Sequence, residues 1–297
     1  MRFLIVDAFT ESVFGGNPAG IVILDKGMDF PSDEIMVKTA AELRYSETAF
    51  IKQLGEKEFN IRYFTPAAEV ELCGHATIGS FAAMLHLGMI KDNDIYMNHT
   101  LSGDLNIKVE NGYVMMDMAS PVKINEISTR EAIDELYEIM GVKYDESLGL
   151  IPQMISTGLI DIMMPVKDEV ELEKIDPDMK ALTELSRKYE VVGVHAFTAD
   201  VKAVEIAGED QLQTHARNFA PLYDIDEEAA TGTSNGALTY YFYLNDMLLP
   251  SKKCKVIQGE KMQRPSVIMT SLEEKADGQL IQVGGSAVVL AEGEIYL

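Results

Sequence analysis

The sequence predicts an α+β fold made of two similar halves, each with strands around one buried helix. Residues 72–90 and 229–245 contain no Asp, Glu, Lys or Arg, although these four types make up 25% of the chain. Both stretches open with small residues and continue with large apolar ones, which is typical of a helix packed on all sides. His75 and Thr233, near the two openings, lie 158 residues apart in a chain of 297. That separation is about half the chain.

The segments around the first uncharged stretch have the pattern of β-strands. Apolar side chains alternate at Phe59, Ile61 and Tyr63, as they do in a half-buried strand. A hairpin is predicted around Asn111-Gly112, because this dipeptide tolerates the positive φ of a tight turn. The predicted strands before this hairpin are Phe3–Phe9, Ala19–Leu24, Thr48–Gln53 and Phe59–Phe64.

A change of pattern after the hairpin marks the predicted domain boundary. Ala119, Ser120 and Pro121 interrupt the alternation, so we expect an N-terminal domain at 1–119 and a C-terminal domain at 120–297. This division leaves room for the C-terminal strand of the chain to cross back and join the N-terminal domain. The second half is predicted to contain helices at Thr129–Met140 and Asp178–Tyr189, and strands at Val191–Thr198, Val201–Ile206, Lys255–Gln258 and Val267–Leu272.

Charge and composition exclude several classes of function. A net charge of −23, from 48 acidic and 25 basic side chains, repels nucleic acid and anionic membrane surfaces. Polar residues dilute the run at 72–90 too heavily for a membrane span, and the N-terminal residues lack the apolar region of a signal peptide. Two cysteines cannot form a disulfide framework. We therefore expect a cytoplasmic protein with no nucleic-acid or membrane partner.

The small residues at the two helix starts have two interpretations. A helix that begins at Gly74-His75 or at Gly232-Thr233 presents unsatisfied N–H groups and the positive end of its dipole, which together favour a bound anion. Alternatively, the glycines only allow close packing at the start of each helix. The occurrence of the pattern once in each half makes an anion site a hypothesis worth testing.

The sequence lacks the spacing of common metal and cofactor sites. The five histidines form no i, i+4 pair, and no Cys-x-x-Cys motif is present. There is also no Gly-Lys-Ser phosphate loop, and the glycines do not follow the spacing of a dinucleotide-binding domain. We expect neither a metal nor a cofactor.

Six blocks of sequence, taken in order, resemble the phenazine-biosynthesis isomerase (PhzF-like) family. They lie at 6–24, 46–51, 61–80, 215–221, 227–238 and 258–266, and include GNPAG, SETAFI, CGHAT, HARNFAP and TGTSNGAL. The resemblance implies the diaminopimelate-epimerase-like fold, with two pseudo-symmetric domains, each a curved mixed β-sheet around a central α-helix. It also implies an active site in the cleft between the domains, a homodimer, and cofactor-independent proton transfer.

The same resemblance assigns roles to residues of both halves. Glu47 in SETAFI is implied as the acid/base, and His75 as the group that orients the substrate or relays its proton. A carboxylic acid suits this role in a dry cleft, because desolvation moves its pKa toward neutrality. Gly74 and Gly232 are implied as backbone donors to the substrate. Asn17 in GNPAG is expected to face the cleft, although Asn-Pro also has a structural role in turns.

Two positions depart from the family pattern. Glu228 stands where the family has an aspartate, so the carboxylate is kept but its reach grows by one methylene. Thr233 stands where the family has a serine, which preserves a hydroxyl. Arg264 could pair with a carboxylate, but Gln263 replaces a common glycine beside it, which leaves the role of Arg264 open.

We therefore expect an isomerase that moves a proton by general acid/base catalysis on a small anionic metabolite with a carboxylate. One alternative is a catalytically idle protein of the same fold that binds a small molecule. A second is a thiol-based epimerase, which needs a cysteine at each helix start. Cys73 lies at one start but Thr233 at the other, and Cys254 is on a predicted strand, so we interpret Cys73 as a small buried residue.

Overall fold

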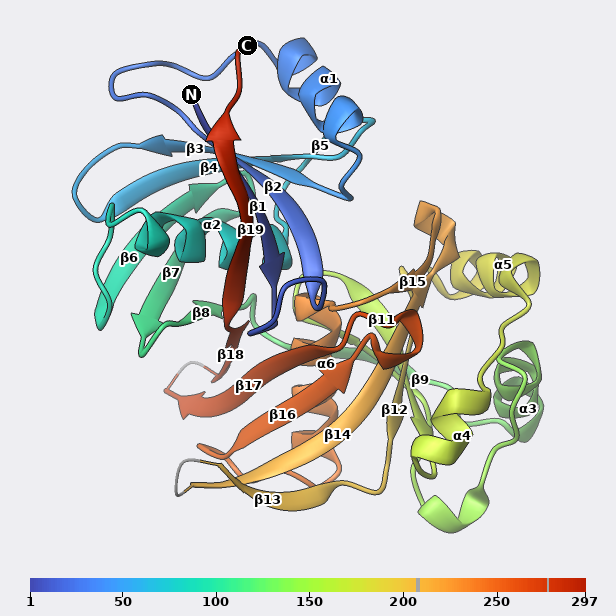
Figure 1. The fold of residues 1–297 in the computed structure, drawn as a ribbon. Coiled ribbons are helices and arrows are strands. Elements are labelled where there is room, and N and C mark those ends of the chain that lie inside the picture. The colour runs from blue at the N-terminus through green and yellow to red at the C-terminus, as the bar shows by residue number, and fades with distance from the viewer. Residues whose placement is uncertain (207–208, 277) are drawn as a thin grey trace. The chain divides into compact units, whose positions relative to one another are not determined.

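The computed structural model describes residues 1–206, 209–276 and 278–297 of the chain. The chain divides into two compact units (Figure 1). The first contains Met1–Asp117 and Gly284–Leu297, and the second contains Met118–Val283. In the described part of the chain, no helix combines the length and the apolar character needed to cross a bilayer.

The first unit is a mixed sheet with two helices. Strand β1 pairs antiparallel with both β2 and β19, and parallel pairs join β2 to β3 and β4 to β6. Antiparallel pairs complete the sheet. The elements are β1 (Arg2–Ala8), β2 (Asn17–Ile23), α1 (Asp33–Leu43), β3 (Thr48–Gln53), β4 (Glu58–Phe64), β5 (Glu69–Val70), α2 (Gly74–His86), β6 (Asp94–Thr100), β7 (Gly103–Glu110), β8 (Tyr113–Asp117) and β19 (Ala287–Glu294).

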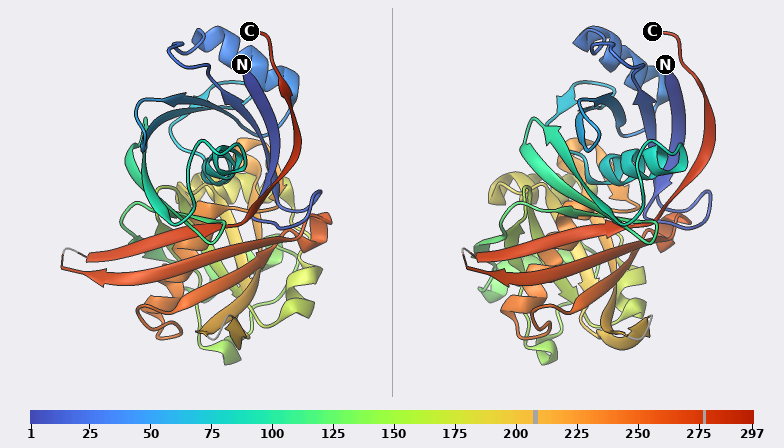
Figure 2. Two further views of the ribbon diagram at one scale, coloured as in Figure 1. Left: turned by 60° about the vertical axis from the view of Figure 1, so that its left-hand side comes forward. Right: turned by 90° about the vertical axis from the view of Figure 1, so that its left-hand side faces the viewer.

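Helix α2 lies inside the curve of this sheet. The left view of Figure 2 shows the helix nearly end-on, with strands of the first unit around it. It contacts β1, β2, β3, β8 and β19, and Phe81 and Met84 are fully buried. The ring of Phe81 packs edge-on to Phe59 at a centroid separation of 5.8 Å. A charged side chain at the buried positions of this helix, which reach from His75 to Met84, would lose its hydration, which explains why they carry none.

In its described residues, the second unit is a larger mixed sheet with four α-helices and additional 3-10 turns. Its strands are β9 (Val122–Glu126), β10 (Gln153–Ser156), β11 (Ile160–Val166), β12 (Gly193–Thr198), β13 (Lys202–Ile206), β14 (Glu209–Ala220), β15 (Ile225–Glu228), β16 (Lys253–Gln258), β17 (Ser266–Lys275) and β18 (Gly278–Gly285), the last two residues of which belong to the first unit. Its helices are α3 (Arg130–Ile139), α4 (Glu169–Lys174), α5 (Met179–Tyr189) and α6 (Gly232–Leu244), with the 3-10 turns η1 (Glu146–Leu148), η2 (Pro221–Tyr223) and η3 (Glu260–Met262).

The two units repeat one pattern of strand pairing. In the first, the pairs β1–β2, β2–β3, β3–β4, β4–β6 and β6–β7 are antiparallel, parallel, antiparallel, parallel and antiparallel. In the second, β10–β11, β11–β12, β12–β14, β14–β16 and β16–β17 follow the same sequence. In each unit, the chain between the two strands of the second parallel pair contains the uncharged helix: α2 lies between β4 and β6, and α6 between β14 and β16. Parallel neighbours need such a crossover, so the repeat fixes where both helices lie.

Helix α6 is packed closely by its own sheet. It contacts β10, β11 and β17 and lies behind β16 and β17 in the view of Figure 1. A Cβ added to Gly236 would lie 3.0 Å from Thr157 Oγ1 and 3.2 Å from a methyl group of Val283, so a larger residue would force those neighbours to move. The amphipathic helices α3 and α5 instead cover a separate apolar core of the second unit.

The α+β fold predicted from the sequence is confirmed. Both uncharged stretches form helices, and the strands and helices expected at the quoted positions are present with ends shifted by a few residues. Helix α1 was not predicted; its charged face and short apolar stripe gave no clear periodicity. The expected domains were 1–119 and 120–297, with a C-terminal strand allowed to cross back to the first. In the structure, residues 118–283 form the second unit and residues 284–297 belong to the first.

We expect Phe81→Ala to destabilise the protein by about 3–5 kcal/mol, because it leaves a cavity where α2 meets its sheet. Leu101→Ala provides the control, since Leu101 is 63% exposed and its change should stay within about 0.5 kcal/mol. Urea unfolding followed by circular dichroism measures both. Equal midpoints for the two variants would contradict the central role of this helix.

Candidate active site

Glu47 is placed by the parallel pair of β2 and β3. Its carbonyl accepts a hydrogen bond from the Gly20 N–H at 3.3 Å, and Thr48 beside it pairs with Gly20 in the strand register. The Glu47 side chain is 18% exposed. The carboxylate therefore stands at the beginning of β3, largely shielded but still reachable by a small molecule.

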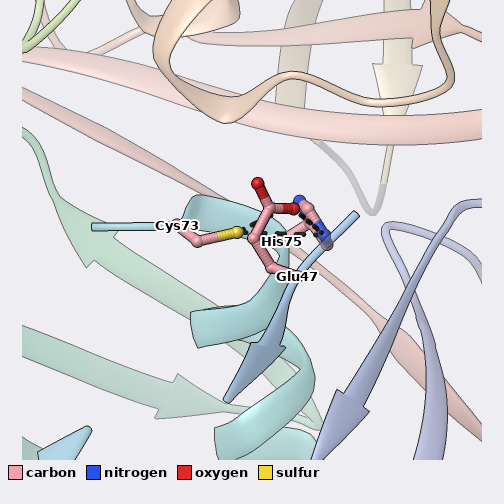
Figure 3. A group of neighbouring side chains, drawn as sticks. All are labelled: Glu47, Cys73 and His75. Atoms are coloured by element: carbon pink, nitrogen blue, oxygen red, sulfur yellow. Dashed lines mark hydrogen bonds and ion pairs between the residues drawn. The ribbon is translucent and has the colours of Figure 1, made fainter. Parts of the chain in front are cut away.

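Three side chains meet at the start of α2, as Figure 3 shows. Nε2 of His75 lies 3.3 Å from Oε2 of Glu47, and the His75 side chain is 4% exposed. Sγ of Cys73 lies 3.4 Å from Nδ1 of the same ring. Ser46 adds a hydroxyl whose Oγ is 3.4 Å from Nε2. Glu47, Cys73 and His75 are also the group of side chains in the described residues that could share a metal ion.

Burial controls the charge of His75. Loss of hydration lowers the pKa of His75 below its usual 6.5, and the nearby Glu47 carboxylate opposes this shift. The imidazole is therefore neutral at neutral pH, with one nitrogen able to donate and the other to accept a proton. A neutral imidazole beside a carboxylate can orient a substrate group or pass a proton without holding a fixed charge.

The two uncharged helices begin in the same way. The N-cap residues are Cys73 for α2 and Thr231 for α6; both have extended backbones and neither caps its helix through its side chain. The first-turn N–H groups have no acceptor within the helix, and the dipole adds positive potential at this end. Gly74 and Gly232 are the first residues of the two helices, so each unit has an uncapped start suited to a carboxylate.

The second unit brings together the other residues implied by the resemblance. Oε2 of Glu228 accepts a hydrogen bond from Thr231 Oγ1 at 2.6 Å, and the Glu228 carbonyl accepts one from Gln258 at 2.7 Å. The Thr233 carbonyl accepts a hydrogen bond from Thr157 at 2.8 Å, which holds the first turn of α6 to its sheet. Glu228, Gly232 and Thr233 are therefore neighbours within one unit.

Asn17 and Arg264 lie at turns or strand ends. Asn17 is the first residue of β2, pairs with Ala8 in the strand register and is 5% exposed. Arg264 follows η3, where its N–H donates to the Gly259 carbonyl and its carbonyl accepts from Ser266. These contacts show that the Arg264 backbone shapes a turn.

A cluster of buried polar side chains beneath α6 was not predicted from the sequence. Asp161 accepts a hydrogen bond from Ser234 at 2.6 Å, and Asn218 donates to Ser234 at 2.9 Å, with all three side chains at most 2% exposed. The available signal was a lone acidic residue in the apolar segment GLIDIMMPV. A single charge inside an otherwise apolar strand indicates a buried polar partner elsewhere in the chain.

Desolvation shifts the pKa values of the buried ionisable groups in this unit. It raises the pKa of Asp161 to about 6, opposed by hydrogen bonds from Ser234 and the Gly193 backbone. It lowers the pKa of His195 to about 3, opposed by Asn235. His195 is therefore neutral, and Asp161 changes its charge within the mildly acidic range.

Comparison with known proteins places the whole chain in one group. Residues 6–293 match the family described as phenazine biosynthesis-like protein. An uncharacterized isomerase of Deinococcus radiodurans is 33% identical, over 98% of this chain and 94% of the relative. The crystal structure of a PhzF-family protein from Bacillus anthracis aligns with a TM-score of 0.83 at 24% identity, over 100% of this chain and 99% of that one. A hydroxyproline epimerase from Agrobacterium vitis shares the fold, with a TM-score of 0.64 at 12% identity over 99% of this chain and 90% of that one.

We expect Asp161→Asn to remove a pH dependence of stability. Because the folded pKa of Asp161, about 6, exceeds its usual 3.8, the folded protein holds this proton more tightly than the unfolded chain does. Binding of this proton stabilises the folded state fully below about pH 4, and the stabilisation is lost as pH rises through about 6. The free energy of unfolding therefore falls by about 3 kcal/mol over this range. Denaturant unfolding at several pH values should show the wild type losing stability relative to the variant over this range.

The control for this measurement is Asp246→Asn, which changes an exposed aspartate of the same unit. It should follow the wild-type pH profile, because a solvated side chain has a similar environment in folded and unfolded states. A profile of Asp161→Asn that runs parallel to the wild type would show that Asp161 does not hold its proton in this way.

Proposed function

The chain belongs to the phenazine biosynthesis-like (PhzF) family of isomerases, and we propose that it moves a proton on a small carboxylate-bearing metabolite by general acid/base catalysis. Glu47, as a carboxylate, takes the proton from one carbon atom of the substrate and, now protonated, gives it to another carbon atom of the substrate or exchanges it with solvent. No electrons are gained or lost, so the step needs only groups that hold and release a proton.

The observation that carries this proposal is the contact between Glu47 and His75. A largely buried carboxylate lies 3.3 Å from a neutral imidazole, and the Glu47 side chain keeps 18% of its surface exposed. A purely structural ion pair would be favoured by a charged histidine, whereas burial disfavours that charge here. The pair is therefore suited to exchanging a proton with a bound molecule.

The uncapped helix starts supply the second part of the proposal. We propose that the N–H groups near Gly74 bind the substrate carboxylate, with the dipole of α2 stabilising its charge. By the family resemblance, Gly232, Thr233 and Glu228 provide the remaining contacts from the second unit.

Glu47→Gln is expected to lower turnover by at least about 100-fold while leaving the fold intact, because glutamine keeps the size and hydrogen bonding but cannot ionise. Incubation in D2O with a panel of amino acids, hydroxy acids and cyclic unsaturated carboxylates, followed by mass spectrometry, detects proton exchange at carbon. The wild type should introduce deuterium into at least one compound, and Glu47→Gln should fail to do so at a comparable rate.

Glu56→Gln serves as the matched control, since Glu56 is an exposed glutamate of the same unit. It should exchange deuterium at the wild-type rate. An active Glu47→Gln together with an inactive Cys73→Ser would place the proton on sulfur and contradict the carboxylate mechanism. Binding of a compound without any exchange in the wild type would instead favour a protein that only holds its ligand.

Thr233→Val tests the contribution of the second unit. Valine keeps the shape of the side chain but removes the hydroxyl, and the loss of a hydrogen bond to a charged group costs about 1.5–3 kcal/mol. We expect kcat/KM to fall by about tenfold or more on the compound identified in D2O. An unchanged kcat/KM would remove Thr233 from the proposed substrate contacts.

A further inference from the structure

Glu47, Cys73 and His75 offer three different donor atoms to one point in the first unit. Their carboxylate oxygen, sulfur and ring nitrogen all lie within 4.8 Å of one another. Cys73 and His75 are 7% and 4% exposed, and Oε2 of Glu47 is buried without a hydrogen-bond partner among the described residues. Oxygen, nitrogen and sulfur donors in such proximity are the ligands that Zn²⁺ takes in proteins.

The separations of these atoms match the dimensions of a zinc site. Tetrahedral bonds of about 2.3 Å to sulfur and about 2.0–2.1 Å to nitrogen and oxygen place sulfur about 3.5 Å from nitrogen, and nitrogen about 3.4 Å from oxygen. In the structure, Sγ of Cys73 lies 3.8 Å from Nε2 of His75, and Nε2 lies 3.3 Å from Oε2 of Glu47. These two separations therefore differ from those of a zinc site by only a few tenths of an ångström, and the sulfur and the carboxylate oxygen lie within 4.8 Å of each other.

The imidazole ring must turn for a metal to bind. Sγ of Cys73 is 3.4 Å from Nδ1 and 3.8 Å from Nε2, and such similar distances place the sulfur against the face of the ring. A lone pair of Nε2 reaches a shared ion only after rotation about the bond between Cβ and the ring. That torsion has broad energy wells in histidine, so the rotation is a small change within the site.

Charge favours a divalent cation at this point. A carboxylate and a thiolate together carry two negative charges, which one Zn²⁺ neutralises and which outweigh the partial positive charge of about half a unit at the start of α2. Binding releases the thiol proton to solvent as the sulfur–zinc bond forms, without oxidation or reduction. The protein as a whole has a net charge of −23, which raises the local concentration of cations.

We propose that Glu47, Cys73 and His75 form an inhibitory Zn²⁺ site, in which the metal binds the carboxylate and imidazole that would otherwise transfer the proton. Three protein ligands leave a fourth position for water or for a substrate carboxylate. The inhibitory consequence rests on the proposed function, whereas metal binding does not. Cys73 thereby acquires a role that neither packing nor acid/base catalysis requires of it.

Titration of the metal-free, reduced full-length protein with Co²⁺ tests the site directly, because a cobalt–thiolate bond gives a charge-transfer absorption in the near ultraviolet. We expect this band to saturate at one Co²⁺ per chain and to disappear when Zn²⁺ is added, since Zn²⁺ binds such sites more tightly. Absence of the band in the folded wild type under a large excess of Co²⁺ would overturn the proposal.

The variants assign the ligands. Cys73→Ser should lose the band, while Cys254→Ser should keep it, because Cys254 is a buried thiol outside the cluster. Glu47→Gln and His75→Gln should each weaken Zn²⁺ binding by at least about 100-fold, more than the loss of an outer-shell partner costs. Circular dichroism confirms that each variant is folded. A wild-type band in Cys73→Ser would place the metal elsewhere and overturn the assignment.

The deuterium-exchange assay then separates this inference from the proposed function. Zn²⁺ should suppress exchange in the wild type over the same concentration range in which it displaces Co²⁺, and a chelator should restore it. Metal binding without any exchange activity would support the site and contradict the proposed catalysis. Exchange activity that persists when Zn²⁺ saturates the site would overturn its inhibitory role.

Discussion

The enclosure of an uncharged helix by a curved sheet is the constraint on which the rest of this structure depends. A helix packed on all sides has no place for a charged side chain, because each would lose its hydration without a partner. Close approach of helix and sheet also limits side-chain size, as Gly236 against Thr157 shows. Polar side chains farther along the helices, such as Ser80 and Thr239, are small and hydrogen-bonded, and the backbone N–H groups without an acceptor inside the helix lie in the first turn.

The repeated architecture places different chemistry at equivalent positions. The N-cap and second helical residues are Cys73 and His75 in α2, but Thr231 and Thr233 in α6. The first unit thus carries a thiol and an imidazole beside the Glu47 carboxylate, while the second carries hydroxyls beside the Glu228 carboxylate. Because the backbones begin both helices alike, the side chains alone distinguish the two helix starts.

The buried hydrogen bonds beneath α6 show how the second unit fixes the start of its helix. Asp161 and Asn218 come from two strands of the sheet and both contact Ser234, in the first turn. Burying a carboxylate is costly, which the raised pKa of Asp161 expresses. In return, the geometry of the helix start is specified by directional bonds, whereas apolar packing alone would tolerate small shifts of the helix along its axis.

The sequence by itself determined the α+β class, the two buried helices and the glycine at the start of each, because these features depend on local patterns of charge and size. It also indicated Glu47 and His75 separately, through the family resemblance. Only the tertiary structure brought them within 3.3 Å, added Cys73 to the same group and joined Asp161 to Ser234, 73 residues away. Such contacts depend on strand register and on crossover connections, which set distances between distant segments and leave no periodic pattern in the sequence.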